Sequence, residues 1–141
     1  MSRNAIRFLH GDQGTSAIEF ALVVPIFLTL TFGVIVYGAY FASLGVVQQI
    51  AYEAARASVT GLTDAERQSL ATARASALVA SYGGLLNTPT VTINAVSTGA
   101  GSFAVTVTQQ FDALGLGNIS GILPMPPAQQ SATVEVARGG Y

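Results

Sequence analysis

The charge-free run in the first third of the chain is the feature that most restricts its fold. No Asp, Glu, Lys, Arg or His lies between Glu19 and Glu53. A helix needs about 20 apolar residues to cross the hydrocarbon core of a bilayer, so this run is long enough. From Phe20 to about Phe41 such a helix is apolar on every side, which is typical of contact with lipid. We therefore predict one transmembrane span over residues 18–41.

A cleaved secretory signal is the alternative explanation for this apolar segment. The apolar core of such a signal has about 7–15 residues, and a small-residue cleavage site follows it. The run here is longer, and the nearest A-x-A motif, Ala55-Arg56-Ala57, contains a charged residue. Arg3 and Arg7 precede the run, whereas acidic and basic residues are mixed after it. This asymmetry favours a cytoplasmic N-terminus and a periplasmic C-terminal domain.

The helical pattern continues beyond the apolar run and becomes amphipathic. One side carries apolar or small residues at helical spacing: Leu44, Val47, Ala51, Ala54 and Ser58. The other side carries polar residues: Gln48, Gln49, Glu53 and Arg56. A single helix over residues 15–60 is about 66 Å long, more than twice the thickness of the hydrocarbon core. Its C-terminal third must therefore leave the membrane and carry a domain, which we place at residues 61–141.

A capping box predicts where a second helix begins. Thr63 precedes Glu66 by three residues, so its hydroxyl can accept a hydrogen bond from the Glu66 amide while the Glu66 carboxylate reaches back to the cap. The following helix is rich in alanine. Gly83-Gly84 predicts a left-handed stop at its end, with Leu85 placed for the usual hydrophobic contact.

The remaining sequence alternates with a period of two residues, which predicts three half-buried strands. The inward positions are Val91, Ile93 and Ala95, then Phe103, Val105 and Val107, and finally Ala132, Val134 and Val136. The turn signal at residues 98–101, with Gly99 and Gly101, joins the first two strands in a hairpin. The predicted fold class is therefore α+β: a long helix and a second helix cover one face of a three-stranded antiparallel sheet. We expect the part from about Glu53 onwards to fold on its own.

The segment 112–130 between the last two strands is a long and unusually apolar loop. Its apolar residues are Leu114, Leu116, Ile119, Ile122, Leu123 and Met125. It packs against the sheet edge or forms a helical turn, or else it contacts another subunit or the membrane surface.

The composition excludes several functional classes. Only 9% of the residues are charged, the net charge is -1 and there is no lysine, so we expect no nucleic-acid partner. There is no cysteine, and His10 is the single histidine, which leaves little with which to build a catalytic triad or a metal site. Asp64, Glu66 and Asp112 are conceivable metal ligands, but Asp64 and Glu66 are better explained by the first turn of a helix, where acidic side chains interact favourably with the helix dipole. We expect no enzyme activity, metal or cofactor.

The segment "GTSAIEFALVVPIF", Gly14 to Phe27, resembles the N-terminus of type IV prepilin-like proteins. It is most similar to the TadE/TadF-like pseudopilins of the bacterial tight-adherence (Flp pilus) system. The resemblance implies that residues 1–14 are a leader, that a prepilin peptidase cuts between Gly14 and Thr15, and that Glu19 is the fifth residue of the mature chain. It also implies contacts with pilin or pseudopilin subunits and an inner-membrane assembly platform, and a role in adhesion or secretion.

Glu19 has two possible roles at the membrane edge. Cleavage would create an ammonium group at Thr15, one helical turn away, and charges at membrane depth are usually paired. Alternatively, the side chain of Glu19 extends to headgroup water. Further along the run, Pro25 removes a helix hydrogen bond. Small residues at spacings of four and three favour close helix contacts in membranes: Gly38, Ala42 and Gly45.

Three functions agree with these features. The first is a cleaved pseudopilin that enters or primes a pilus, either in the inner membrane or at the cell surface. The second is an uncleaved single-pass anchor of the same apparatus. The third is a tethered periplasmic ligand-binding module, for which the sequence offers no acid–base pair or phosphate loop.

Overall fold

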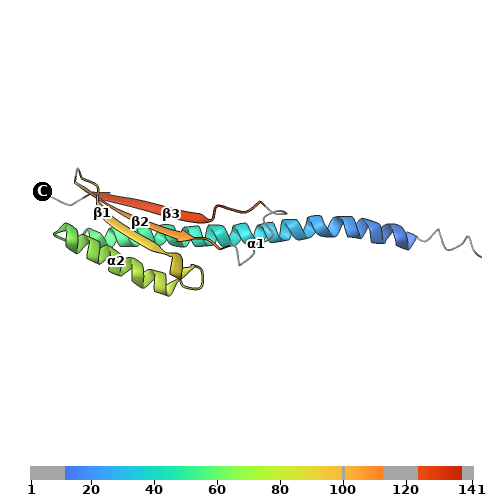
Figure 1. Ribbon diagram of the computed structural model, residues 1–141, viewed down its shortest axis with the longest axis horizontal. Coiled ribbons are helices and arrows are strands. Elements are labelled where there is room, and N and C mark those ends of the chain that lie inside the picture. Colours follow the sequence, from blue (N-terminus) through green and yellow to red (C-terminus); the bar gives the residue numbers. More distant parts are fainter. Residues whose placement is uncertain (1–11, 100, 113–123, 138–141) are drawn as a thin grey trace, which may run out of the picture. The chain divides into compact units, whose positions relative to one another are not determined.

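The computed structural model describes residues 12–99, 101–112 and 124–137. Its elements are α1 (Asp12–Ser58), α2 (Asp64–Ser81), the 3-10 helix η2 (Thr88–Thr90), β1 (Thr92–Ser97), β2 (Ser102–Gln110) and β3 (Gln129–Ala137). Figure 1 labels the α-helices and the strands. The predicted α+β class is confirmed. Most of the expected leader, with His10, lies outside the described residues.

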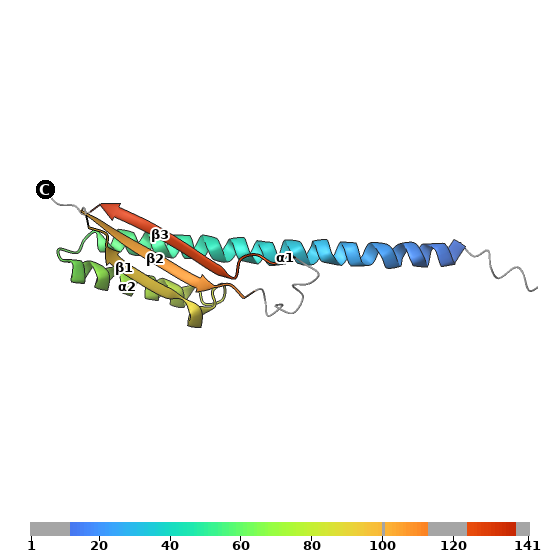
Figure 2. The same cartoon turned by 45° about the horizontal axis from the view of Figure 1, so that its top comes forward.

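The chain divides after Ile35 into two compact units, which are described separately. In the first unit, the described residues are the N-terminal part of α1, and none of the side chains from Thr15 to Ile35 is buried. The second unit, from Val36 onwards, contains the rest of α1 together with α2 and the sheet. In this unit, α2 and the C-terminal part of α1 lie on the same side of the sheet and run in opposite directions (Figures 1 and 2).

The sheet has the strand order β1-β2-β3, and both pairs of strands are antiparallel. Its register places Val105 opposite both Ala95 of β1 and Val134 of β3. Gly99 and Gly101 both have a φ of 85°, which confirms the hairpin predicted between β1 and β2, because L side chains disfavour this left-handed region.

The core of the second unit lies between the helices and the inward face of the sheet. Helix α1 contributes Val46, Val47, Ile50, Ala51, Ala54 and Ala55, and α2 contributes Ala71 and Ala75. Phe103, Val105 and Val107 of β2 are each at most 1% exposed, as the alternation predicted. The inward apolar residues of β3, Ala132, Val134 and Val136, are only half-buried. Because much of the helical contribution is alanine, the helices approach the sheet closely but bury little area per residue.

This core begins before the start expected from the sequence. The sequence suggested that a domain could start at about Glu53, where charges return. Val47, Ile50 and Ala51 precede that position and are completely buried in the same core. A charge-free sequence is equally suited to lipid and to a protein core, which is why the sequence did not separate the two environments.

Helix α2 begins almost as predicted. The hydroxyl of Thr63 accepts a hydrogen bond from the Glu66 amide at 3.2 Å. The reciprocal bond differs from the expected one, because the Glu66 carboxylate accepts from the Leu62 amide, at 2.9 Å. Both bonds satisfy amides at the N-terminal end of the helix, where no carbonyl of a preceding turn is available.

The predicted left-handed stop at the end of α2 is wrong. Neither Gly83 nor Gly84 has a positive φ; the chain continues through a turn in which the Leu85 amide donates to the Tyr82 carbonyl at 2.8 Å. The hydrophobic contact also moves by one residue. Leu85 is 56% exposed, whereas Leu86 is 6% exposed and belongs to the core.

The link between the two helices is closely packed around Gly61. Gly61 is buried, and Arg67 is only 8% exposed. The Nε of Arg67 donates to the Gly61 carbonyl at 2.8 Å, and the Arg67 amide donates to the Thr63 carbonyl at 2.9 Å. A Cβ at position 61 would lie 2.7 Å from Arg67 Cγ and 2.8 Å from the Arg67 amide nitrogen. The path of the backbone therefore requires glycine here.

The outward face of the sheet is lined by hydroxyl groups. The Thr106 and Thr133 hydroxyls are 2.9 Å apart, and those of Thr108 and Ser131 are 3.1 Å apart. At the hairpin end, Glu135 accepts from Ser102 and Thr98. Both hydrogen bonds lower the pKa of Glu135 below its ordinary value of 4.5, and the bond from Ser102 has the larger effect.

The loop before β3 ends slightly earlier than predicted, because β3 begins at Gln129. Within it, Met125 is half-buried and Pro126 is buried. The Phe111 amide donates to the Ala128 carbonyl, so the two ends of the loop meet. Five of its apolar residues lie outside the described residues: Leu114, Leu116, Ile119, Ile122 and Leu123.

Candidate functional site

The predicted cleavage position lies within the first turns of α1. Gly14 and Thr15 are both helical, and α1 begins only two residues before Gly14. A bond this close to a helix end is easily exposed by fraying. The side chains of Thr15 and Glu19 are exposed, and residues four apart lie on the same side of a helix. An ammonium group at Thr15 would therefore form one turn from the Glu19 carboxylate.

The helix surface beyond Glu19 is apolar and uncovered. Among the described residues, α1 is the one helix long and apolar enough to cross a membrane, with a mean hydropathy of 2.4 in its most apolar window. Its exposed apolar side chains in the first unit are Ile18, Phe20, Leu22, Val23, Ile26, Phe27, Leu28, Leu30, Phe32, Val34 and Ile35. Exposure on all sides is unfavourable in water and expected in lipid, so α1 has the character of a membrane anchor.

Pro25 lies inside α1 without ending it. Its ring has no N–H, so one carbonyl of the preceding turn has no helical donor. The Thr29 hydroxyl donates to the Pro25 carbonyl at 2.8 Å, and the Thr31 hydroxyl donates to the Phe27 carbonyl at the same distance. These bonds satisfy both hydroxyls within the helix, as an apolar environment requires.

The three small residues predicted to pack helices are all exposed. Gly38, Ala42 and Gly45 lie on α1 in the second unit, and added Cβ atoms at the two glycines would meet nothing within 4 Å. The core is built from the other side of α1, where Val36, Val47 and Ile50 are completely buried. The small residues therefore leave a shallow strip that the described part of the chain does not cover.

Aromatic side chains gather near the end of the apolar run. The rings of Tyr40 and Phe111 meet edge-to-face at a centroid distance of 5.3 Å, which connects α1 to the end of β2. Phe41 contacts Tyr40 at 5.5 Å and Tyr37 at 6.5 Å. Tyrosines with apolar bodies and polar tips are typical of the membrane–water interface.

A buried polar network lies beside this aromatic cluster. The Gln130 amide donates to the Tyr40 carbonyl at 3.0 Å, and its oxygen accepts from the Ser43 hydroxyl at 3.0 Å and from Gln109 at 2.6 Å. Gln109 and Gln130 are at most 2% exposed. Neither glutamine was predicted to be buried, although each continues the inward alternation of its strand by one step. Both positions follow the spacing of two residues that marks the inward face of a strand, but a polar side chain there suggested an exposed position.

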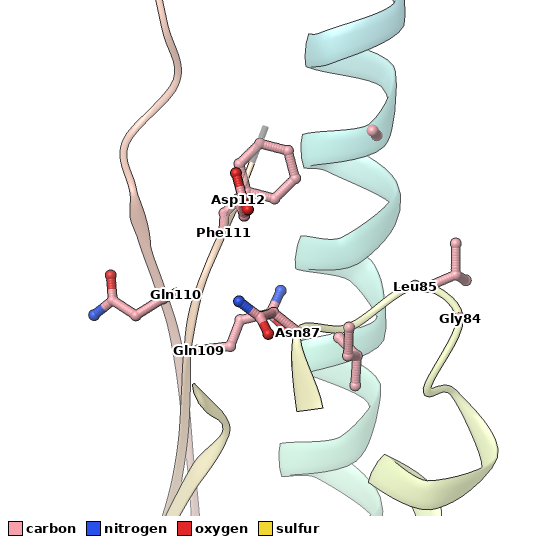
Figure 3. A pocket seen from close by; sticks show the side chains of 9 residues that line it. Gly84, Leu85, Asn87, Gln109, Gln110, Phe111 and Asp112 are labelled. Atoms are coloured by element: carbon pink, nitrogen blue, oxygen red, sulfur yellow. The ribbon is translucent and has the colours of Figure 1, made fainter. Parts of the chain in front are cut away.

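The network borders a cavity of about 270 Å³. The lining residues come from α1, the α2–β1 connection and the end of β2: Ala39, Gly84, Leu85, Leu86, Asn87, Gln109, Gln110, Phe111 and Asp112. Figure 3 shows the Gln109 side chain directed from β2 toward α1 and Asn87, whereas Gln110 points the other way. The oxygen of Gln109 is buried without a hydrogen-bond partner in the described structure.

No group of three or more His, Asp or Glu side chains that could hold a metal ion exists within the described ranges. Asp64 and Glu66 lie in the first turn of α2, as the capping box predicted. Asp112 lines the cavity.

In a comparison with known protein families, residues 14–56 match the family model described as TadE-like protein. The match covers under a third of the chain and begins at the glycine of the predicted cleavage site. It confirms the resemblance seen in the sequence and indicates a component associated with tight-adherence pili. Neither a curated protein nor a solved structure matched the chain.

Proposed function

We propose that this chain is a pseudopilin-like structural or assembly component of a tight-adherence pilus or of a related secretion apparatus. The observation that carries the proposal is the N-terminal part of α1, an uncovered apolar helix with the exposed carboxylate of Glu19 near its start. The TadE-like match begins at Gly14 and includes this segment. A structural role also agrees with the mostly alanine and aliphatic core of the second unit, which is built for packing.

The proposed topology follows from the charges at the two ends of the apolar run. Residues 18–41 span the bacterial inner membrane, with Arg3 and Arg7 on the cytoplasmic side. The sheet and α2 then lie in the periplasm, and extraction of the subunit into a pilus would move them to the cell surface. In this proposed topology, Tyr37 and Tyr40 would lie at the periplasmic membrane–water interface.

Processing by a prepilin peptidase is the first proposed step. The peptidase cuts the Gly14–Thr15 bond at the cytoplasmic edge, after the first turn of α1 opens. The new ammonium group at Thr15 pairs with the Glu19 carboxylate of the same chain or of a neighbouring subunit. Support for the pairing comes from the exposure of Glu19 and from the cost of an isolated charge at membrane depth.

The strip formed by Gly38, Ala42 and Gly45 is the proposed contact for another membrane helix. It is exposed, and the absence of side-chain bulk allows two backbones to approach closely. Pro25 lies on the same helix, where a neighbouring helix would cover the irregular carbonyl. Other pilin or pseudopilin subunits and the inner-membrane assembly platform are the partners that this surface would serve.

The decisive experiment is the mass of the protein isolated from membranes. The full chain is expressed with and without a tight-adherence prepilin peptidase, and its intact mass and N-terminal sequence are determined. We expect a chain starting at Thr15 only when the peptidase is present. Gly14→Leu should block the cut, whereas Gly11→Leu makes the same change three residues earlier and should leave it intact.

The result also separates the proposal from its main alternative. The peptidase must be active in this experiment, which its processing of its own pilin would show. If the chain nevertheless keeps Met1 to Gly14, the proposed cleavage is wrong. The protein would then be an uncleaved single-pass anchor of the same apparatus, because the exposed apolar helix remains either way.

A further inference from the structure

We propose that the second unit docks on the surface of the lipid bilayer with its base, the end at which the chain enters the unit at Val36. The contact is made by an apolar patch, here called the basal patch, which consists of Tyr37, Tyr40, Phe41, Leu85 and Phe111. The inference rests on the proposed topology, in which residues 18–41 span the membrane. It adds a second lipid contact, from segments that lie far from the span in the sequence.

Contacts with α1 place Leu85 and Phe111 at the level where the span ends. The rings of Tyr40 and Phe111 meet edge-to-face at 5.3 Å, which holds the end of β2 against α1. Ala39, Leu85 and Phe111 line the same cavity, so the α2–β1 connection reaches this level of α1 as well. In the view of Figure 3, Phe111 lies to one side of α1 and Leu85 to the other. The base of the second unit therefore surrounds α1 on more than one side.

The basal patch exposes apolar surface at this level. Phe41 is 63% exposed and Leu85 is 56% exposed, whereas Tyr37, Tyr40 and Phe111 are half-buried. A single exposed leucine is common, but aromatic and aliphatic side chains gathered at one level are typical of an interaction surface. Aromatic side chains are also enriched where a membrane protein passes from lipid to water. The chemistry of the patch therefore fits the interfacial layer of a bilayer.

The charges of the second unit are concentrated away from its base. No charged residue lies between Glu19 and Glu53 or between Arg74 and Asp112, and these two stretches supply the whole basal patch. The α1–α2 connection and the β1–β2 hairpin lie together at the opposite end in Figure 1. Toward that end or the middle of the unit lie the other charged residues of its described part: Glu53, Arg56, Asp64, Glu66, Arg67, Arg74 and Glu135. Docking by the base leaves all of them in water, so lipid contact requires little desolvation of charge.

Continuity with the apolar helix favours lipid over a protein as the partner. Val34 and Ile35, at the end of the first unit, are exposed apolar residues on the same helix as Phe41. Phe41 follows Ile35 by about 9 Å along α1, at 1.5 Å per residue, so lipid that surrounds the anchor reaches the basal patch without a gap. The exposed carboxylate of Asp112, next to Phe111, limits the depth. The base therefore reaches the headgroups and stays above the hydrocarbon core.

The test measures how closely lipid approaches the two ends of the second unit. The chain has no cysteine, so single cysteines can be introduced into the full chain and labelled with a fluorophore. Leu85→Cys reports on the base, and Leu62→Cys, before the other end of α2, is the matched control, because Leu62 is 90% exposed. Phe27→Cys reports on the span itself. Each labelled chain is reconstituted into phosphatidylcholine vesicles that contain a lipid with a nitroxide quencher either on its headgroup or deep in its acyl chain.

We expect the headgroup quencher to reduce the fluorescence at position 85 strongly and at position 62 little, and the deep quencher to act at position 27. Weak quenching at position 85 with normal quenching at position 27 would overturn the docking and leave the anchor intact; the basal patch would then be free for a protein partner. Equal quenching at positions 85 and 62 would also overturn it, because contact would not be specific to the base. Absence of quenching at position 27 would refute the proposed topology itself.

A matched pair of charge variants tests the contribution of the Leu85 side chain. The label is placed at the exposed position 87 with Asn87→Cys, and Leu85→Glu is compared with Leu62→Glu. Leu85→Glu should lower the ratio of quenched to unquenched label about fivefold or more, because the apolar contact is lost and a charge is brought to the lipid surface. Leu62→Glu should leave the ratio unchanged. Both leucines are exposed, so neither change disturbs the core, and equal effects of the two variants would contradict docking through the basal patch.

Discussion

Substituting Gly61 by alanine should destabilise the second unit more than any other single methyl addition at a described glycine. The added Cβ would lie 2.7 Å from Arg67 Cγ, 2.8 Å from the Arg67 amide nitrogen and 3.0 Å from Arg67 Cα. Contacts below about 3 Å are repulsive for carbon, whose optimum is roughly 3.5–4.0 Å. Two of the three contacts are with backbone, so no change of rotamer can relieve them. The first turn of α2 has to move.

The displacement would also strain the bonds that hold this turn. Arg67 Nε donates to the Gly61 carbonyl at 2.8 Å, so the side chain cannot swing away without breaking this bond and removing a donor from the carbonyl of a buried residue. Overpacking of this kind costs about 1–3 kcal/mol. Each kcal/mol lowers Tm by about 4–8 °C in a domain of roughly 60–100 residues. We therefore expect a clear loss of Tm with the folded spectrum retained.

The assay is thermal and urea unfolding of the full chain in detergent micelles, followed by far-UV circular dichroism. Gly45→Ala is the matched control, because an added Cβ there meets nothing within 4 Å. It replaces glycine within a helix and should stabilise by roughly 0.5–1 kcal/mol. The double variant G61A/R67A should remain less stable than R67A, since the backbone contacts persist. An unchanged Tm for Gly61→Ala would refute the steric argument.

Three further predictions concern pH, assembly and domain limits. The hydrogen bond from Ser102, which has the larger effect, and the bond from Thr98 both lower the pKa of Glu135 below 4.5. These two bonds therefore stabilise the fold at pH values above 4.5, and this stabilisation is lost as the pH falls through the lowered pKa. The urea midpoints of wild type and Glu135→Gln should converge on acidification, and a pH-independent difference would contradict this. Glu19→Gln should leave membrane insertion and processing intact but abolish pilus assembly in cells that carry only the variant; normal pili would show that Glu19 merely reaches headgroup water. A chain of residues 36–141 should unfold cooperatively, whereas residues 53–141 lack the buried residues of α1 and should not; a cooperative melt of the shorter chain would refute that dependence.

The sequence predicted the strands well because their environment is simple. Phe103, Val105 and Val107 alternate with polar residues, and only one face of a three-stranded sheet can be covered by two helices. The register then follows from the short hairpin at Gly99 and Gly101, whose conformation glycine strongly favours. In these cases a local rule and the tertiary structure demand the same arrangement.

The errors arose where tertiary packing selected between local alternatives. Gly83 and Gly84 permit a left-handed stop, yet the chain turns differently and buries Leu86 instead of Leu85. The sequence placed Val47, Ala51 and Ala54 on the apolar face of the helix, but it did not show that Val46, Ile50 and Ala55 also join the core, because lipid and protein interiors select the same apolar residues. For the candidate site, the positions of Gly14, Thr15 and Glu19 follow from the motif alone, and their proposed roles stay predictions. The cavity beside Gln109 could not be predicted, since it depends on how three segments far apart in the sequence meet.

The pair of buried glutamines has a consequence for how the sheet selects its strand alignment. On β3 the inward residues Ala132, Val134 and Val136 are chemically similar, so sliding the strand by two residues would keep an apolar face inward. On this inward face Gln130 distinguishes the correct alignment, because among the inward residues of β3 it alone bonds to Gln109, the Ser43 hydroxyl and the Tyr40 carbonyl. A shifted strand would bury these polar groups without partners, so the shifted alignment would be less stable than the correct one. The buried amides of Gln109 and Gln130 thus favour one alignment of β3 against β2.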